Sequence, residues 1–211
     1  MWGVLTEAMP TTQPPRPLAD IATLCRLWLT KPRQIATWAP SSGDVGRAFV
    51  RQLAGAPDGL VVELGAGTGP ITAALLENGL ARERLVVIEA DHILHARLCR
   101  RFGPEGMLCL DARDLAATLG DALARGGYEH VSAIVSTLPI LNFAKADQKA
   151  VLDGCFAHAA PTTAMTQITY LPGSPVRQRA LAGWGYQAKR VSRIGRNWPP
   201  ATLWQYRRAD P

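Results

Sequence analysis

The sequence contains few cysteines, and they form no recognisable metal or disulfide motif. Only four occur in the 211 residues, at Cys25, Cys99, Cys109 and Cys155, and no two of them make a CxxC pair. Neither a disulfide framework nor a zinc ribbon is therefore expected. We expect no metal, and the simplest setting for such a chain is the reducing cytoplasm.

Long hydrophobic runs are also missing. The N-terminus, MWGVLTEAMPTTQPPRP, lacks a basic start followed by an uninterrupted apolar stretch, and no later segment offers the run of about eighteen apolar residues that spans a bilayer. The sequence thus predicts neither a secretory signal nor a transmembrane helix.

Acidic side chains are fewer than basic ones. Seventeen Asp and Glu stand against 23 Lys and Arg, which gives a net charge of +6. Such an excess favours an anionic partner, either nucleic acid or a phospholipid surface, without choosing between them. The hydrophobic share of 47% is that of an ordinary globular chain, and 211 residues suffice for one sizeable core.

Hydrophobic periodicity divides the chain into a lead segment and helices. Residues 1–17 contain four prolines and predict a flexible tail. From Leu18 an apolar stripe that includes Trp28 predicts a helix that ends by Pro32, with Lys31 and Arg33 beside it. A second helix is expected after residues 40–42, where a serine can cap its first turn.

From residue 55 onward, strands and helices alternate. Apolar runs predict strands at 60–63, 85–89, 107–110, 131–135 and 165–170, with helices at 70–78, about 94–102, 115–123 and 151–159 between them. The pattern weakens after Arg177 and ends with a strand at 201–207 that we expect at the sheet edge. We therefore predict an α/β, Rossmann-like fold: a mostly parallel sheet with an antiparallel edge strand, covered on both faces.

A glycine-rich stretch, VVELGAGTGP, joins the first predicted strand to the next helix. Its third glycine stands at Gly69, and Pro70 occupies the place where a dinucleotide GxGxxG fingerprint would need glycine. No GK[ST] follows, so Walker-type phosphate binding is excluded as well. Glu63 precedes the loop, and a carboxylate there would repel a diphosphate but balance an ammonium group.

The E-x-G-x-G-x-G pattern resembles the first motif of class I S-adenosylmethionine-dependent methyltransferases. The resemblance implies S-adenosylmethionine as cofactor and S-adenosylhomocysteine as product. It places the methionine end of the cofactor at Glu63 and at the loop residues Gly65, Gly67, Thr68 and Gly69.

Acidic residues also end the next two predicted strands, on the same edge of the sheet. Glu89, followed by Ala90, can accept the ribose hydroxyls. By resemblance, Asp111 receives the adenine amino group, the backbone of Ala112 meets the ring, and Ser136 lies at the border of the cofactor site.

Other clusters of polar side chains do not indicate a metal site or a nucleophilic active site. His92, His95 and Cys99 share a helix face, but such spacing arises readily on any helix, and we do not expect metal binding there. Neither a Ser/His/Asp nor a Cys/His nucleophile set has motif support.

Four further segments indicate a more specific family within this superfamily. KPRQIATWAPSS, STLPILNF, QITYLPGSPV and NWPPATLWQYRR, at residues 31–42, 136–143, 167–176 and 197–208, are similar to those of bacterial phospholipid N-methyltransferases. The resemblance implies methyl transfer to the amine of phosphatidylethanolamine and its mono- and dimethyl derivatives, towards phosphatidylcholine. It also implies peripheral association with an anionic membrane, on the inner face of the cell membrane.

Two alternatives remain open. An rRNA adenine N6-dimethyltransferase would share the fold and the basic charge, but it needs an Asn-x-Pro-aromatic acceptor loop, and residues 136–140 read STLPI. We therefore expect no nucleic acid partner. The other alternative is a cofactor-binding scaffold that has lost catalysis.

Candidate acceptor residues follow from the family-like segments. Ser136 and Asn142 are candidates for contacting the amine, and Tyr170 for orienting it or facing its methylated forms. Arg177 or Arg193 could hold the lipid phosphate, and Asn197 stands in the late family motif. Residues 18–54 are expected to form N-terminal helices that contact the membrane or act as a cofactor lid, and residues 55–211 the methyltransferase domain.

Overall fold

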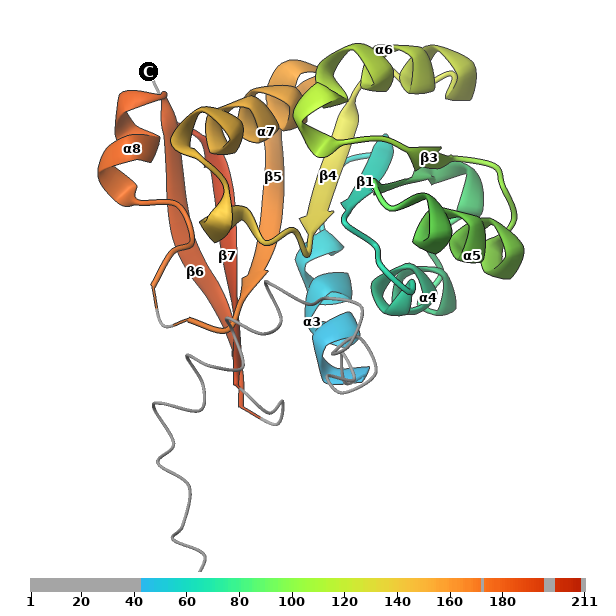
Figure 1. Ribbon diagram of the computed structural model, residues 1–211, viewed down its shortest axis with the longest axis horizontal. Coiled ribbons are helices and arrows are strands. Elements are labelled where there is room, and N and C mark those ends of the chain that lie inside the picture. The colour runs from blue at the N-terminus through green and yellow to red at the C-terminus, as the bar shows by residue number, and fades with distance from the viewer. Residues whose placement is uncertain (1–42, 172, 196–199, 210–211) are drawn as a thin grey trace, which may run out of the picture.

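The structure is a computed structural model that describes residues 43–171, 173–195 and 200–209 (Figure 1). The predicted tail at 1–17, the predicted helix with Trp28, and Asn197 lie outside these described residues.

A single seven-stranded sheet forms the centre of the molecule, in the order β3-β2-β1-β4-β5-β7-β6. The strands from β1 to β5 pair in parallel, while β7 is antiparallel to both of its neighbours. This confirms the predicted Rossmann-like architecture. The strands are β1 Leu60–Leu64, β2 Leu85–Glu89, β3 Met107–Cys109, β4 Val131–Ser136, β5 Ala159–Thr169, β6 Tyr186–Ile194 and β7 Ala201–Arg208.

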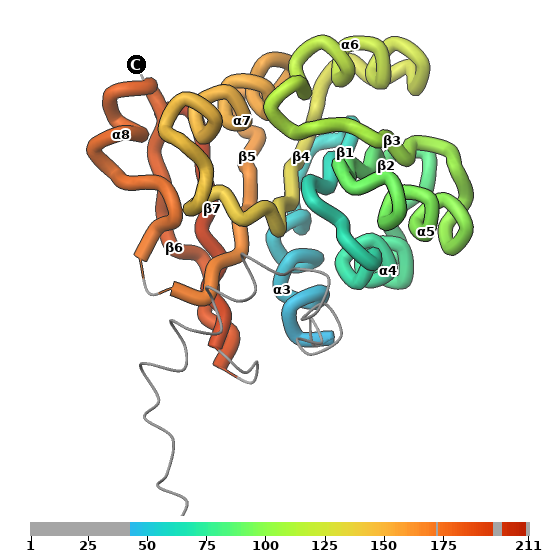
Figure 2. The backbone as a smooth tube through the Cα atoms, viewed as in Figure 1, coloured from blue at the N-terminus to red at the C-terminus, as the bar shows by residue number. Residues whose placement is uncertain are grey.

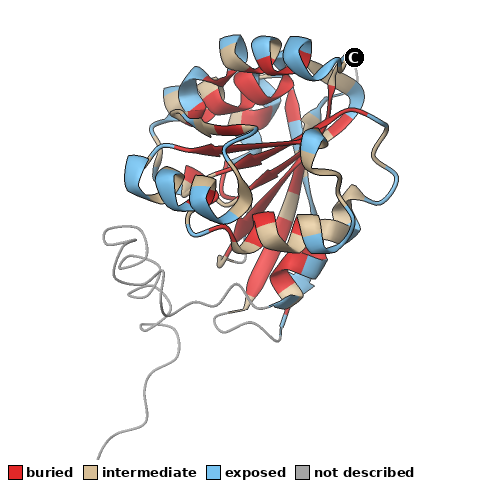
Figure 3. Cartoon of the chain, turned by 90° about the vertical axis from the view of Figure 1, so that its right-hand side faces the viewer, coloured by how far each residue is buried: buried red, intermediate tan, exposed pale blue. Residues whose placement is uncertain are grey.

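Helices cover both faces of the sheet. One apolar cluster joins the sheet to α3 (Gly43–Leu53), α4 (Pro70–Glu77) and α5 (His92–Phe102). The other joins it to α6 (Leu115–Gly126), α7 (Lys145–Ala157) and α8 (Gln178–Gly183). Short 3-10 helices occupy Arg82–Arg84, Ala112–Asp114 and Ile140–Asn142. Figure 3 shows the buried strands between the two helical layers.

The central strands are apolar along their whole length because both of their faces are covered. Every residue of β1, β2 and β4 is buried, Glu63, Glu89 and Ser136 included. Burying such side chains is costly unless they are bonded or meet a ligand. Glu63, Glu89 and Ser136 lie at or near the carboxyl ends of their strands and so point to the site, whereas Ser132, near the start of β4, donates to the carbonyl of Leu60.

The C-terminal region differs from expectation. Neither α8 nor β6 was predicted, and β6, not β7, is the outermost strand. Exposed Lys189, Arg190 and Arg193 interrupt the apolar alternation of β6, and its register shifts between Arg190 and Ser192. An exposed edge strand with an irregular register has a weak period-two signal, which is why the sequence did not reveal it.

Candidate active site

Two loops meet at the carboxyl edge of the sheet, where the strand order reverses between β1 and β4. The glycine loop follows β1, and residues 137–143 follow β4 (Figure 1). Ligands of open α/β sheets bind at such a reversal point because the neighbouring connections leave it on opposite faces. The Thr137 hydroxyl donates to the carbonyl of Gly65 over 2.5 Å, which ties the two loops together.

The three loop glycines all have positive φ, but they serve different purposes. A Cβ on Gly65 would lie 2.9 Å from Leu138 Cδ2, and one on Gly69 would lie 2.5 Å from the Phe102 ring. These two glycines therefore permit close packing. A Cβ on Gly67, at φ +59°, would meet no atom within 4 Å, so its backbone borders open space that a ligand can enter.

Glu63 presents an unusual buried carboxyl group. One oxygen, Oε2, accepts a hydrogen bond from the Thr72 hydroxyl at 2.7 Å, and the other, Oε1, is buried without a partner among the described residues. Burial raises the pKa of Glu63 to about 7, although the bonds from Thr72 act in the opposite direction. A buried acceptor oxygen beside open backbone fits the ammonium of a bound amino acid moiety.

Glu89 holds the glycine loop as well as facing the site. Its Oε2 accepts from the backbone N–H of Gly67 at 2.8 Å, and its Oε1 accepts from that of Asp91 at 2.9 Å. Each carboxylate oxygen can accept more than one bond, so the group retains capacity for ribose hydroxyls. Asp91 in turn caps α5 by accepting from Ile93 and Leu94.

The Asp111 carboxylate accepts more hydrogen bonds from within the protein than the sequence suggested. Its carboxylate accepts from the backbone N–H of Arg113 and from two guanidinium nitrogens of the same residue, at 2.6–2.9 Å. These bonds hold the pKa of Asp111 below its usual value. Ala112 is buried beside it, while Ala90 and Thr68 are exposed, and the Thr68 carbonyl accepts from Arg101.

At the end of β4, Ser136 belongs to a buried polar network. Its hydroxyl donates to Gln167 Oε1 at 2.7 Å and accepts from the backbone N–H of Leu138 at 3.3 Å. Gln167 Nε2 donates to the carbonyls of Leu138 and Ile168. This network fixes the loop after β4 onto the end of β5. Gln167 was not among the predicted site residues, although a glutamine within an apolar strand was an available signal.

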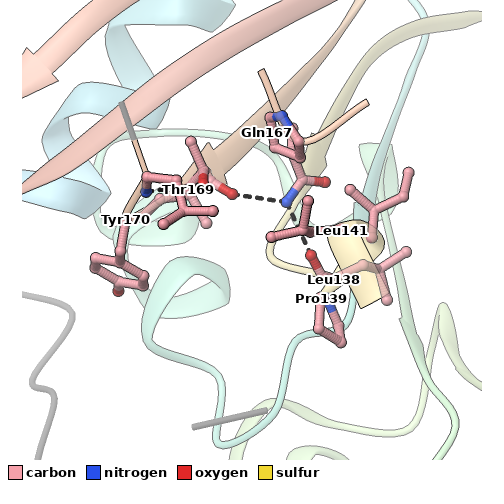
Figure 4. Close-up of a pocket in the computed structure, with 10 residues that line it drawn as sticks. Leu138, Pro139, Leu141, Gln167, Thr169 and Tyr170 are labelled. Carbon is pink, nitrogen blue, oxygen red and sulfur yellow. Dashed lines mark hydrogen bonds between the residues drawn. The ribbon is translucent and has the colours of Figure 1, made fainter. Parts of the chain in front are cut away.

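An aliphatic pocket lies beside this network (Figure 4). Its empty space, including space open to solvent, amounts to about 420 Å³. Tyr170 and Leu138 lie on opposite sides of it in Figure 4. Leu138 also lies against Gly65, so the pocket borders the glycine loop. The lining residues are Leu138, Pro139, Ile140, Leu141, Gln167, Ile168, Thr169, Tyr170, Leu171 and Pro175.

Two other candidates lie outside the lining of this pocket. Asn142 is exposed at the end of the short helix Ile140–Asn142, and Arg177 is exposed where α8 begins. Cys99 and His95 do approach each other, at 3.5 Å, but no group of three or more possible metal ligands occurs within the part of the chain that the structure describes.

The fold is shared with solved methyltransferases. The glycopeptide N-methyltransferase solved with S-adenosylmethionine has a TM-score of 0.58 at 14% identity, and the match covers 81% of this chain and 95% of that one. The 1,6-didemethyltoxoflavin-N1-methyltransferase of Burkholderia thailandensis, solved with S-adenosylhomocysteine, has a TM-score of 0.61 at 17% identity over 95% and 94% of the two chains. Another structure of the glycopeptide enzyme holds sinefungin.

This fold, with its glycine loop and strand-end carboxylates, is that of the class I S-adenosylmethionine-dependent methyltransferases. No protein-family profile matches the chain. A curated relative does: the ornithine lipid N-methyltransferase of Singulisphaera acidiphila is 34% identical over 141 residues, which are 65% of this chain and 71% of that protein. The chain belongs to the same family as that lipid N-methyltransferase.

Proposed function

We propose that this protein transfers methyl groups from S-adenosylmethionine to the amine of a membrane lipid. One observation supports this function above all. Gly67, with its open backbone, belongs to the loop that follows buried Glu63, and Leu138, which lines the aliphatic pocket, lies against Gly65 of that loop. A donor with a charged amino acid end and an acceptor with apolar chains would therefore meet at Leu138.

The donor side would be held by the residues at the ends of β1, β2 and β3. The Glu63 carboxylate faces the ammonium, the backbone of Gly65, Gly67 and Gly69 lies against the methionine end, and Glu89 accepts from the ribose. When bound, S-adenosylmethionine supplies a methyl group that its sulfonium already activates. The protein therefore needs to align the acceptor and exclude water.

The acceptor amine must lose a proton before it can attack, because an alkylammonium with a pKa of about 10 is charged at neutral pH. The aliphatic walls from Leu138 to Leu141 disfavour the charged form by desolvation. Tyr170 would face the amine or its methylated forms through its ring. Ser136, whose hydroxyl is bonded to Gln167, would act on the amine by positioning this loop rather than by direct contact.

For the headgroup, we propose phosphatidylethanolamine and its mono- and dimethyl derivatives as acceptors, on the strength of the four family-like segments. Ornithine lipid is the second candidate, since the curated relative is named for it. Both offer a primary amine on a lipid with acyl chains. An RNA adenine acceptor is not favoured, because the loop after β4 supplies leucines where a base would need an asparagine and an aromatic platform.

The place of action would be the membrane surface, with the protein bound peripherally. Across the described ranges, the structure contains no helix both long and apolar enough to cross a bilayer. The proposed localisation is the cytoplasmic side of the cell membrane, where both the soluble donor and the lipid amine are accessible.

The test is a transfer assay with labelled S-adenosylmethionine and four separate acceptors: phosphatidylethanolamine, ornithine lipid, ribosomal RNA and buffer alone. Label in extracted phosphatidylethanolamine and its methylated products supports the first proposal, and label in ornithine lipid alone would replace it with the second. Label confined to RNA, or donor binding without transfer to either lipid, contradicts a lipid function.

A further inference from the structure

The charge of this protein is distributed very unevenly along the chain. Residues 154–209 hold eight of the 23 Lys and Arg and none of the 17 Asp and Glu. The remaining residues therefore hold 15 basic and 17 acidic side chains, and the whole positive excess comes from one C-terminal segment. That segment contains α8 and the strands β5, β6 and β7, which form the part of the sheet beyond β4.

Within this segment, the fold gathers basic side chains at the open edge of the sheet. Helix α8 packs beside β6 (Figure 2), and Gln178 Nε2 donates to the carbonyl of Ala188 at 3.1 Å. That bond anchors the first turn of α8 next to the first residues of β6. We call the five exposed basic residues of these two elements the cationic edge: Arg177, Arg179, Lys189, Arg190 and Arg193.

Most of the cationic edge shares one side of the sheet. Arg190 lies opposite Trp204, and Arg193 lies opposite Thr202. Residues opposite each other in a sheet point to the same face, and Trp204 packs on the face that α6, α7 and α8 cover. Arg190 and Arg193 therefore point to the face of the sheet that α8 covers, while Lys189 points to the other face.

The side chains of the cationic edge have no ion-pair partner within the described residues. Elsewhere in the described residues, four basic side chains form ion pairs: Arg47 with Asp44, Arg84 with Asp58, Arg113 with Asp111, and Lys149 with Asp153. Charges on an edge strand also prevent sheet-to-sheet association. That role does not explain Arg177 and Arg179, which belong to α8 and its cap and not to the strand.

The aliphatic pocket opens close to this edge. Thr169 lines the pocket and lies opposite Thr202, which in turn lies opposite Arg193. Two strand spacings of about 4.8 Å place the Arg193 backbone roughly 10 Å from that of Thr169. Arg177 follows the pocket residue Pro175 by two positions. A negatively charged surface that bound the cationic edge would thus lie in front of the pocket.

We propose that the cationic edge docks the protein on the surface of an anionic phospholipid bilayer. The inference rests on the proposed lipid function, and it assigns the membrane contact to folded residues of the sheet edge. Each basic side chain near an anionic leaflet gains attraction from the surface potential, and the absence of acids across 154–209 leaves that attraction unopposed. Docking in this orientation would bring a headgroup to the mouth of the pocket.

The test uses the full chain and compares two double variants of equal charge change. Arg179→Glu with Arg190→Glu alters the cationic edge but no residue that we place in the active site. Arg97→Glu with Arg125→Glu alters exposed positions on α5 and α6, away from this edge. Binding is measured by co-sedimentation with vesicles of phosphatidylcholine and phosphatidylglycerol in equal parts, and with vesicles of phosphatidylcholine alone.

We expect the first variant to bind the anionic vesicles about 30-fold more weakly than the wild type, and the second less than threefold more weakly. Wild-type binding should fall with added salt and be absent from neutral vesicles. Equal losses in both variants would show that net charge alone matters and would overturn the proposal. Retained vesicle binding by the first variant would also overturn the proposal. If that variant kept its affinity for vesicles but lost affinity for a ribosomal RNA fragment, the cationic edge would be an RNA-binding surface instead.

A separate readout distinguishes docking from catalysis. Methyl transfer to an acceptor lipid dispersed in neutral detergent needs no anionic surface, so the first variant should match the wild type there. If the wild type binds anionic vesicles through this edge but methylates no lipid, the proposed function fails and the docking surface stands. If the first variant loses its activity in neutral detergent, the edge acts on catalysis and the docking proposal is overturned.

Discussion

At the residue scale, Glu63 combines complete burial with one bonded and one unpaired oxygen. Its carboxyl group is costly to ionise in the unliganded protein, and burial raises its pKa from 4.5 to about 7. A bound ammonium would reverse this effect by favouring the charged form. The Glu63 carboxylate thus destabilises the protein when no cofactor is bound, and it contributes to the affinity for the cofactor.

The first prediction concerns stability and pH. Because the native pKa of Glu63 is raised, the native state holds this proton more tightly than the unfolded state. The resulting stabilisation is complete below pH 4.5 and is lost as pH rises through about 7. Over that window the wild type should lose of the order of 3 kcal/mol relative to Glu63→Gln, at about 1.4 kcal/mol per pKa unit.

Denaturant unfolding of the unliganded proteins between pH 4.5 and 8 measures this difference. Parallel pH profiles for the wild type and Glu63→Gln would contradict the assignment of the raised pKa to Glu63. In the same variant, calorimetry should find S-adenosylhomocysteine binding weakened by about 100-fold, because a neutral amide cannot balance the ammonium.

Gly67 gives the second prediction. At φ +59°, Gly67→Ala should cost roughly 1 kcal/mol of stability, and the added methyl would enter the space next to the loop backbone. We expect the affinity for S-adenosylhomocysteine to fall at least tenfold.

The matched control is Gly127→Ala at the C-terminus of α6, where φ is +69° and a Cβ also meets nothing within 4 Å. It should show the same loss in thermal denaturation with unchanged cofactor affinity. Equal affinities for the two variants would mean that the space at Gly67 is not the cofactor site.

At the element scale, the end of β5 holds the loop after β4 through one side chain. Gln167 is 1% exposed and bonds both to Ser136 and to the carbonyl of Leu138. The aliphatic pocket, where we propose that the acceptor binds, therefore depends on contacts between two strands whose bonded residues are 31 positions apart in the chain.

The third prediction follows from that network. Gln167→Leu leaves the Ser136 hydroxyl and the Leu138 carbonyl without these partners, at a cost of about 2–4 kcal/mol. If the protein remains folded, the KM for the acceptor lipid should rise about tenfold while cofactor affinity stays unchanged.

The control for this element is Thr163→Val, which removes a buried hydrogen bond to Val131 at the start of the same strand pair. It should reduce stability by about 1 kcal/mol without altering either kinetic constant. An unchanged acceptor KM in Gln167→Leu would separate this network from the acceptor site.

At the scale of the whole molecule, the reversal of strand order brings the ends of β1, β2 and β4 together, and the cofactor would contact several of them at once. Ligand binding should therefore stabilise the fold as a unit. At 100 times its dissociation constant, S-adenosylhomocysteine adds about 2.7 kcal/mol, which for a domain of this size raises Tm by roughly 5–10 °C.

Differential scanning fluorimetry measures this fourth prediction. Glu63→Gln at the same ligand concentration should show little or no shift, whereas Gly127→Ala should shift as far as the wild type. A wild type without any shift would argue against cofactor binding at the loop after β1.

The sequence by itself determined the alternation of strands and helices and the acidic strand ends, because these patterns are set by neighbouring residues along the chain. The spacing of Gly65, Gly67 and Gly69 is likewise a local property. Only the tertiary structure decided which side chains of different elements meet: Thr72 with Glu63, Gln167 with Ser136, and α8 with the unpredicted strand β6. Such pairings depend on the register and order of the strands, which no local pattern encodes.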